Sequence, residues 1–288
     1  MTVSLRTPLS ADLPDLLEAL GRWQRDAAPV QLHPGDVGWF QRLGEAALLE
    51  ALRGWWLEGR LVAVALLDGA EVARLAQAPA LWGDRALADR VGADLADPDR
   101  GVLGEGRVSV EAPAGSAVRD ALAALGWEPG EPWTPLRRDL AEPVEDSGLH
   151  IEVVGPSRVE ARVAVQRAAF DSSTFSAERW EAMAEGPAYT DARCLLGHDA
   201  DGTPVAAATV WSAGLGHPGL LEPVGVHRDH RGRGHGAAIS RAAAATLREL
   251  GSSSAVVCTR SSNAAAVATY RAAGFTEGPA VPDLTRPT

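Results

Sequence analysis

A glycine-rich turn between two apolar segments is the part of this sequence whose residue types and spacing most clearly predict chemistry. The turn follows the apolar run 220–226, precedes the alanine-rich segment 237–250, and consists of Arg231, Gly232, Arg233, Gly234, His235 and Gly236. An order of strand, turn and helix directs unpaired backbone N–H groups and the positive end of a helix dipole to one point. Because glycines also let the backbone approach a ligand closely, we expect a phosphate or pyrophosphate at this turn.

The composition restricts the class of protein further. The chain has 288 residues, which is enough for two domains, and a hydrophobic fraction of 46% predicts sizeable cores. The formal net charge of −11 argues against a binder of nucleic acid or anionic membranes, because both partners need a positive field. A local basic group at Arg228, Arg231, Arg233 and Arg241 remains compatible with a phosphate ligand.

The two cysteines and the lengths of the apolar runs indicate whether to expect a metal site, disulfides or a membrane span. Cys194 and Cys258 lie far apart and have no metal-type spacing, so we expect no metal site, no disulfide framework and a reducing cytoplasm. Both cysteines are interpreted as buried strand residues. No apolar run is long enough to span a bilayer, and residues 1–6 lack the layout of a signal peptide.

The chain has two halves with the same order of predicted elements. In the first half, a strand at 3–6 precedes a helix that Ser10 or Asp12 caps; in the second, a strand at 150–154 precedes a helix that Ser157 caps. The strand 61–67 corresponds to 205–211, and the helix ending Leu-Gly-Trp at 127 corresponds to the one ending Ala-Gly-Phe at 275. This pattern predicts an internal duplication.

The polar stretch 141–148 predicts the boundary between a domain at 1–141 and a domain at 149–288. The halves differ at the phosphate turn, where the first carries Trp82, Gly83, Asp84, Arg85 and Ala86. A single glycine offers fewer free N–H groups, and Asp84 repels a phosphate. We therefore expect that the first domain has lost the anion site.

The second half resembles the GNAT superfamily of N-acetyltransferases. The residues that carry the resemblance are 222–226, the turn 227–236, the strand 255–258, and 263–275, where Asn263, Tyr270, Gly274 and Phe275 follow the family pattern. The resemblance is good over about 150–280 and covers 1–140 only by element order. It implies an α/β fold with two tandem GNAT-like modules, each a mixed, mostly antiparallel sheet flanked by helices, the first of them degenerate.

The resemblance also implies a cofactor and its contacts. Acetyl-CoA would place its pyrophosphate at the turn, where Arg231 and Arg233 would neutralise it, and its pantetheine arm along Val224, Gly225 and Val226, bonded like an added strand. In the family this strand bulges and separates from the next strand, near Cys258. Asn263 and Ala266 complete the implied cofactor contacts.

Two residues are implied to be catalytic. Tyr270 would direct its hydroxyl at the thioester sulfur as an acid, although a half-buried core role is the alternative. Glu222 lies two residues before Val224 and is the expected base, although it could equally be a solvated strand residue. His227 is a second candidate base and fits a turn residue better.

The acceptor side carries several aromatic residues. Phe170, Phe175 and Trp180 flank the segment 171–174, which closes over the acceptor in the family. An aromatic, mildly acidic rim would suit a cationic or amphipathic amine, which is a hypothesis.

The sequence therefore predicts transfer of an acetyl group from acetyl-CoA to a primary amine, a small molecule, by direct attack in a ternary complex. Two alternatives stay open: an enzyme like mycothiol synthase, which is also a tandem GNAT protein, and an acyl-CoA sensor without catalysis. A monomer is slightly favoured, because a tandem chain can replace the dimer of single-module relatives, and a homodimer is possible.

Overall fold

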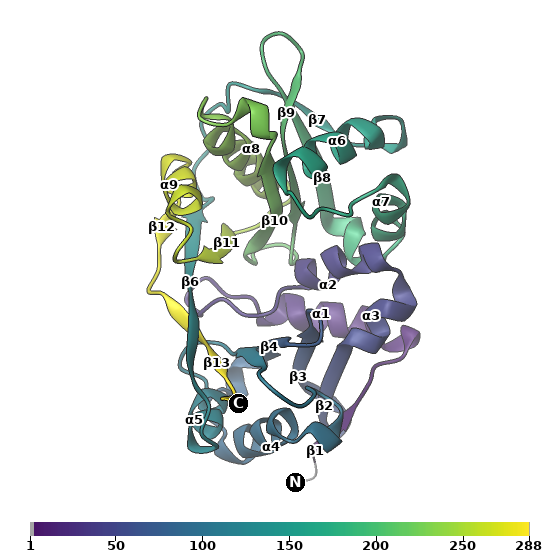
Figure 1. Ribbon diagram of the computed structural model, residues 1–288, viewed down its shortest axis with the longest axis vertical. Coiled ribbons are helices and arrows are strands. Elements are labelled where there is room, and N and C mark those ends of the chain that lie inside the picture. Colours follow the sequence, from purple (N-terminus) through teal and green to yellow (C-terminus); the bar gives the residue numbers. More distant parts are fainter. Residues whose placement is uncertain (1–2, 288) are drawn as a thin grey trace. The chain divides into compact units, whose positions relative to one another are not determined.

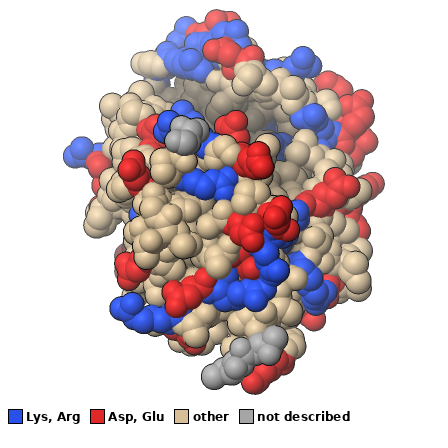
Figure 2. All heavy atoms as spheres, turned by 60° about the horizontal axis from the view of Figure 1, so that its bottom comes forward, with Lys and Arg blue, Asp and Glu red and all other residues tan. Residues whose placement is uncertain are grey.

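The computed structural model describes residues 3–287, which form two compact units (Figure 1). Unit 1 comprises residues 3–33, 45–133 and 280–287, and unit 2 comprises residues 34–44 and 134–279. None of the described helices is long and apolar enough to cross a membrane. On the face in Figure 2, acidic and basic side chains are interspersed.

Unit 1 is a sheet with helices, in which the strands follow the order β1-β2-β3-β4-β5-β13-β6. The strands are β1 (Val3–Arg6), β2 (Leu52–Leu57), β3 (Arg60–Leu67), β4 (Val72–Gln77), β5 (Ser109–Glu111), β13 (Val281–Thr285) and the first part of β6 (Glu128–Asp139). The helices are α1 (Leu13–Trp23), α3 (Glu45–Ala51), α4 (Arg85–Ala96) and α5 (Ala117–Ala124).

Unit 2 repeats this plan with the order β6-β11-β10-β9-β8-β7, and a short β12 also pairs with β6. Its strands are the last part of β6, β7 (His150–Val153), β8 (Ala192–His198), β9 (Pro204–Trp211), β10 (Gly219–Val226), β11 (Ser254–Arg260) and β12 (Thr276–Glu277). Its helices are α2 (Pro34–Phe40), α6 (Val159–Ala169), α7 (Ala177–Ala184), α8 (His235–Glu249) and α9 (Ala264–Ala272).

The strand pairings of the two units confirm the internal duplication. Strands β1 to β4 pair antiparallel in sequence and β4 then pairs parallel with β5; β7 to β10 and β11 do the same in unit 2. The expected fold class, tandem GNAT-like modules with mixed, mostly antiparallel sheets, is confirmed. The expected helix cap at Ser157 is wrong, because Ser157 lies in a 3₁₀ turn and the side chain of the capping position, Arg158, accepts no bond.

The two compact units do not follow the contiguous division at 141–148. The change between units occurs within β6, at Trp133 and Thr134, because this long strand contributes residues to both units. Residues 34–44 of the first half belong to unit 2, and the end of the chain returns to unit 1 as β13. Sequence order alone could not indicate these exchanges, since neither segment has a distinctive composition.

Helix α2 joins unit 2 through close contact with Trp211 on β9. The Trp211 side chain is 1% exposed, and its indole N–H donates to the carbonyl of Glu222, 2.7 Å away. A Cβ added at Gly35 or Gly38 would lie within 2.5 Å of the Trp211 ring or its Cβ. The two glycines therefore let the backbone of α2 lie directly on this tryptophan.

We predict that Gly38→Val destabilises unit 2 by about 1–3 kcal/mol, because the new side chain overlaps Trp211. Thermal unfolding should shift down by roughly 2–4 °C for each kcal/mol. Gly83→Val is the matched control, since open space surrounds that position. An unchanged Tm for Gly38→Val would contradict the packing of α2 on Trp211.

Candidate active site

The site is built where β10 separates from β11 in unit 2. The two strands pair in parallel at Gly219 with Ala255 and at Leu220 with Val256, and their pairing ends there. On its other side β10 stays paired with β9, with a register shift between Leu221 and Val224 that marks a bulge. The expected bulge and separation are confirmed, and they leave the edge of β10 that faces β11 open from Leu221 onward.

The turn after β10 presents a set of free N–H groups at the start of α8. Gly232 and Gly234 have φ values of 75° and 84°, which favour glycine, and Gly234 is the N-cap of α8. No described residue accepts a hydrogen bond from the backbone N–H groups of residues 232–237. Nothing lies within 4 Å of a Cβ built at either glycine, so the turn is open to a ligand.

Two other glycines of the predicted motif serve the packing of helices. A Cβ at Gly225 would lie 2.7 Å from the Ala169 Cβ at the end of α6, and a Cβ at Gly236 would lie 2.8 Å from the Thr269 Cγ2 on α9. Asn263 caps α9, because its side chain accepts from the N–H of Ala266 at 3.1 Å. Its amide nitrogen keeps donor capacity.

The arginines near the turn divide into two groups. Arg228 and Arg231 donate to carbonyls in the last turn of α6, Arg228 Nε to Ala168 at 2.9 Å and Arg231 Nη2 to Ala169 at 2.7 Å. These two residues therefore fix the end of α6 to the turn, a role that the sequence reasoning did not anticipate. Arg233 is exposed, and its charge acts on His235.

His235 begins α8, and its surroundings disfavour the protonated imidazole in the ligand-free protein. Burial lowers its pKa, the charges of His230 and Arg233 lower it further, and Asp199 opposes them. His227 caps the following 3₁₀ turn instead of acting on a ligand, because its Nδ1 accepts from the N–H of Asp229 at 3.3 Å. This agrees with its interpretation as a turn residue.

Tyr270 is buried, and the charge of Glu222 acts on it. The Tyr270 side chain is 9% exposed, and its ring packs on Phe275 with centroids 5.8 Å apart. Burial raises the pKa of Tyr270, and the Glu222 charge and Cys258 add to the rise. Its hydroxyl therefore stays protonated at neutral pH and can serve as a donor.

Cys258 corrects one expectation from the sequence. It is exposed rather than buried, because β11 has lost its β10 neighbour two residues earlier. Cys194 on β8 is buried, as expected. Among residues 3–287, no cluster of histidine, cysteine and carboxylate side chains could hold a metal ion.

In the equivalent turn of unit 1 a side chain satisfies one of the N–H groups at the helix start. The Asp84 carboxylate accepts from the N–H of Leu87 at 3.0 Å and caps α4, which corresponds to α8. Strand β4 pairs with β3 without a register shift, so the bulge of β10 has no counterpart there. A side-chain carboxylate thus occupies the position where unit 2 leaves room for an external anion.

Of the three aromatic residues expected at the acceptor rim, Phe170 is exposed at the surface, whereas Phe175 and Trp180 are not. Phe175 is 3% and Trp180 6% exposed, so both belong to the core of unit 2. Asp171 is exposed and pairs with Arg228 at 3.2 Å. The sequence analysis did not identify Arg162, which lies fully buried among these residues. Its burial could have been predicted from its position three residues after Val159, which places it on the apolar face of α6.

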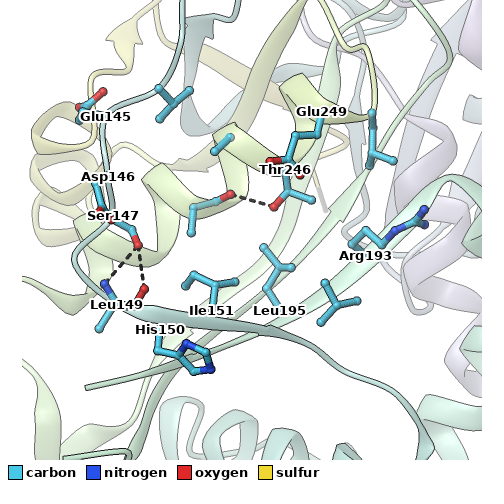
Figure 3. Close-up of a pocket in the computed structure, with 15 residues that line it drawn as sticks. Glu145, Asp146, Ser147, Leu149, His150, Ile151, Arg193, Leu195, Thr246 and Glu249 are labelled. Carbon is cyan, nitrogen blue, oxygen red and sulfur yellow. Dashed lines mark hydrogen bonds between the residues drawn. The ribbon is translucent and has the colours of Figure 1, made fainter. Parts of the chain in front are cut away.

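A cavity of about 660 Å³ lies on another side of unit 2 (Figure 3). It is bounded by the segment 144–149, by β7 and β8, and by the C-terminal half of α8. The C-terminal end of a helix dipole is negative, and Glu145 and Glu249 add negative charge, so the cavity does not suit a phosphate. It contains none of the residues that the sequence analysis assigned to a site.

Comparison with known proteins agrees with this geometry. Residues 162–275 match the family model "Acetyltransferase (GNAT) family". Over these residues the chain is similar to a GNAT acetyltransferase domain. No curated protein sequence matches the chain.

Solved structures of GNAT proteins are similar over the full length. A GNAT-family acetyltransferase from Colwellia psychrerythraea is 15% identical, with 99% of each chain covered and a TM-score of 0.62. A tandem GNAT protein from the clavulanic acid biosynthesis pathway is 18% identical, with 99% of this chain and 98% of that chain covered and a TM-score of 0.58. A GCN5-related N-acetyltransferase from Sphaerobacter thermophilus is 20% identical, with 99% of this chain and 95% of that chain covered and a TM-score of 0.55. At these identities the likeness shows the fold, a tandem GNAT architecture.

We predict that the amides of residues 232–237 exchange hydrogen rapidly in the free protein, since no described group accepts from them. The amides of Leu87 and Ala88 are the internal comparison, because Asp84 accepts from both. Hydrogen–deuterium exchange resolved to short peptides measures the difference. Equal protection of the two turns would contradict an open anion site in unit 2.

Proposed function

We propose that unit 2 transfers an acetyl group from acetyl-CoA to a primary amine by direct attack in a ternary complex. The observation that carries the proposal is the open edge of β10, which leads directly into the free N–H groups at the start of α8. The GNAT family model over residues 162–275 supports acyl transfer as the reaction class. In this proposal unit 1 is a scaffold without an anion site, and the chain acts as a cytoplasmic monomer on a small molecule.

The residues of unit 2 fit an acyl-CoA. The N–H groups of residues 232–237 and the exposed Arg233 would hold its phosphates, and the open edge from Val224 to Val226 would hold its amide-bearing arm. Acyl-CoA supplies an activated thioester carbonyl, so the protein has to align an amine with it. The protein also has to accept one proton from the amine and donate one proton to the departing thiolate.

Glu222 and Tyr270 suit the two proton transfers. Glu222 is partly exposed at the bulge of β10, where its carboxylate can accept a proton from an incoming ammonium group. Tyr270 keeps its proton at neutral pH, since the ordinary pKa of tyrosine is well above 7 and burial raises it further, so it can donate to the departing thiolate. The N–H of Val224, beside the bulge, is the candidate donor to the carbonyl oxygen as negative charge develops there.

Calorimetric titration of acetyl-CoA should give one site per chain. Gly234→Trp should abolish binding, because its side chain would fill the turn and residue 234 has a positive φ. Gly83→Trp, at the corresponding turn of unit 1, is the matched control and should bind normally. Two sites per chain, or equal binding by both variants, would contradict the assignment.

Kinetics with an accepted amine separate the two catalytic roles. We expect Glu222→Gln and Tyr270→Phe each to lower kcat by about 10²-fold or more with little change in acetyl-CoA binding, as for loss of a general acid or base. In Glu222→Gln the acidic limb of the pH profile should disappear. Full activity in both variants, with acetyl-CoA bound, would show that the assignment is wrong, and binding without turnover of any amine would favour a sensor.

Acetyl-CoA affinity should rise as the pH falls through the range of histidine titration. Burial holds the pKa of free His235 below its usual value, and nearby phosphates would raise it in the complex. Binding therefore takes up a proton between the lower free and the higher bound pKa. Titrations between pH 8 and about pH 5.5 should show this trend, and His235→Gln should flatten it; the same slope in both proteins would exclude His235 as a phosphate neighbour.

A further inference from the structure

Arg162 is a cation enclosed in the core of unit 2. It lies in the middle of α6, is 0% exposed, and packs on Phe175 with its Cζ 5.3 Å from the ring centroid. Its Nε donates to the Cys194 sulfur at 3.2 Å, and its Nη1 donates to the Gln166 side chain at 2.8 Å. Its Nη2 has no hydrogen-bond partner.

This environment leaves the positive charge of Arg162 unbalanced. No carboxylate among residues 3–287 forms an ion pair with it, and the groups that it contacts are an amide, a thiol and an aromatic ring. Burying a charge is costly unless it is paired, and a buried donor without an acceptor adds about 1–3 kcal/mol to this cost. Such a group is expected where an anion completes the site.

A second buried donor lies in the same cluster. The Trp180 indole N–H lies near the Tyr189 hydroxyl without forming a hydrogen bond of good geometry, and the ring is edge-on to Tyr189 with centroids 6.2 Å apart. Burial raises the pKa of the Tyr189 hydroxyl and Cys194 adds to the rise, while the contact with Trp180 and the charge of Arg162 oppose it.

These donors connect to the proposed catalytic centre through aromatic contacts. Tyr189 is also edge-on to Trp211, with centroids 6.0 Å apart, and the Trp211 indole N–H donates to the carbonyl of Glu222 at 2.7 Å. These contacts run from the backbone carbonyl of Glu222 through Trp211 and Tyr189 to Trp180, and the charge of Arg162 acts on Tyr189, all within unit 2.

We infer that Arg162 Nη2 and the Trp180 indole N–H form an anion subsite that binds a carboxylate of the amine acceptor. The inference rests on the proposed acetyl transfer and names its substrate class, an amine that carries a carboxylate, as in an amino acid. The carboxylate accepts from both donors, and the guanidinium charge balances it in a site of low dielectric. A cationic acceptor, suggested by the sequence alone, is disfavoured here because Arg162 repels it.

Access to the subsite depends on Phe175, whose ring covers the guanidinium. The connection between α6 and α7 that carries it is held by short local bonds, among them Ser173 N–H to Phe170 O at 3.0 Å and Phe175 N–H to Ser173 Oγ at 3.3 Å. Phe175 lies in this connection and in neither helix, so in our proposal its ring moves aside to admit the carboxylate without breaking a strand or a helix. The ligand then replaces a cation–π contact with an ion pair.

Matched pairs of amines test the inference. Glycine, β-alanine and L-phenylalanine are each compared with their carboxamides as acetyl acceptors. We expect the acid of at least one pair to have a kcat/KM about tenfold or more above that of its amide, roughly the worth of one charge-assisted hydrogen bond. Intrinsic reactivity works against this preference, since an amino amide has more of its amine unprotonated at a given pH. Equal or better use of every amide would overturn the inference.

Two substitutions show whether the preference arises at Arg162 and Trp180. Arg162→Met should remove the preference mainly through the KM of the acid, while the Tm of the free protein is unchanged or higher because a buried unpaired charge has been replaced by an apolar chain. Trp180→Phe keeps the ring and removes the N–H, so it should lower the preference in part. A preference retained in both variants, or an equal loss for acid and amide, would assign these residues a purely structural role.

Thermal unfolding without acetyl-CoA keeps this test independent of turnover. The same carboxylates should raise the Tm of the wild-type protein and not that of Arg162→Met, even if no amine is acetylated and the proposed function fails. Sodium chloride and sodium sulfate are the comparison; an equal rise with them would show a general anion site and overturn the acceptor assignment. No rise with any carboxylate, together with no acid preference, would overturn the subsite itself.

Discussion

The separation of β10 from β11 after Leu220 is the constraint on which the rest of unit 2 depends. A strand edge in the middle of a sheet has backbone donors and acceptors that must be paired with something. Here the bulge between Leu221 and Val224 turns β10 away from β11, while β9 holds its other edge in register. The same separation exposes Cys258, brings Glu222 to the opening, and points the chain toward the turn at the start of α8.

The two units show how one topology can keep or lose a ligand site through few residues. Both contain three antiparallel pairings followed by a parallel one, and both place a helix after the fourth strand. In unit 1 the N-cap of this helix is Asp84, whose carboxylate satisfies the N–H of Leu87. In unit 2 the N-cap is Gly234, which has no side chain to do so, and the N–H groups remain available.

The core of unit 2 combines close packing with incompletely satisfied polar groups. Gly35 and Gly38 bring α2 onto Trp211, and Gly225 brings the end of α6 onto β10, so the backbones there pack closely. Arg162 lies inside this packed region with a donor that no described residue satisfies. Proteins tolerate such local costs where a ligand later compensates them, which is why a buried unpaired cation is informative about the acceptor.

The sequence by itself determined the local elements and the chemistry of the turn. Strand, turn and helix around residues 220–250 follow from apolar runs and glycines, because these are short-range signals that act within a few residues. The duplication and the difference at Asp84 were equally visible, since both are patterns of residue type along the chain.

Only the tertiary structure decided which distant groups meet. The place of residues 34–44 in unit 2, the return of β13 to unit 1, and the contacts of Arg228 and Arg231 with the end of α6 depend on packing between segments far apart in sequence. Trp180 gave no local indication that it is buried rather than on a rim, and Arg162 is surrounded by groups from α6, β8 and the connection to α7. Burial and pairing are properties of the whole fold, because solvent is excluded by neighbours that the local sequence does not specify.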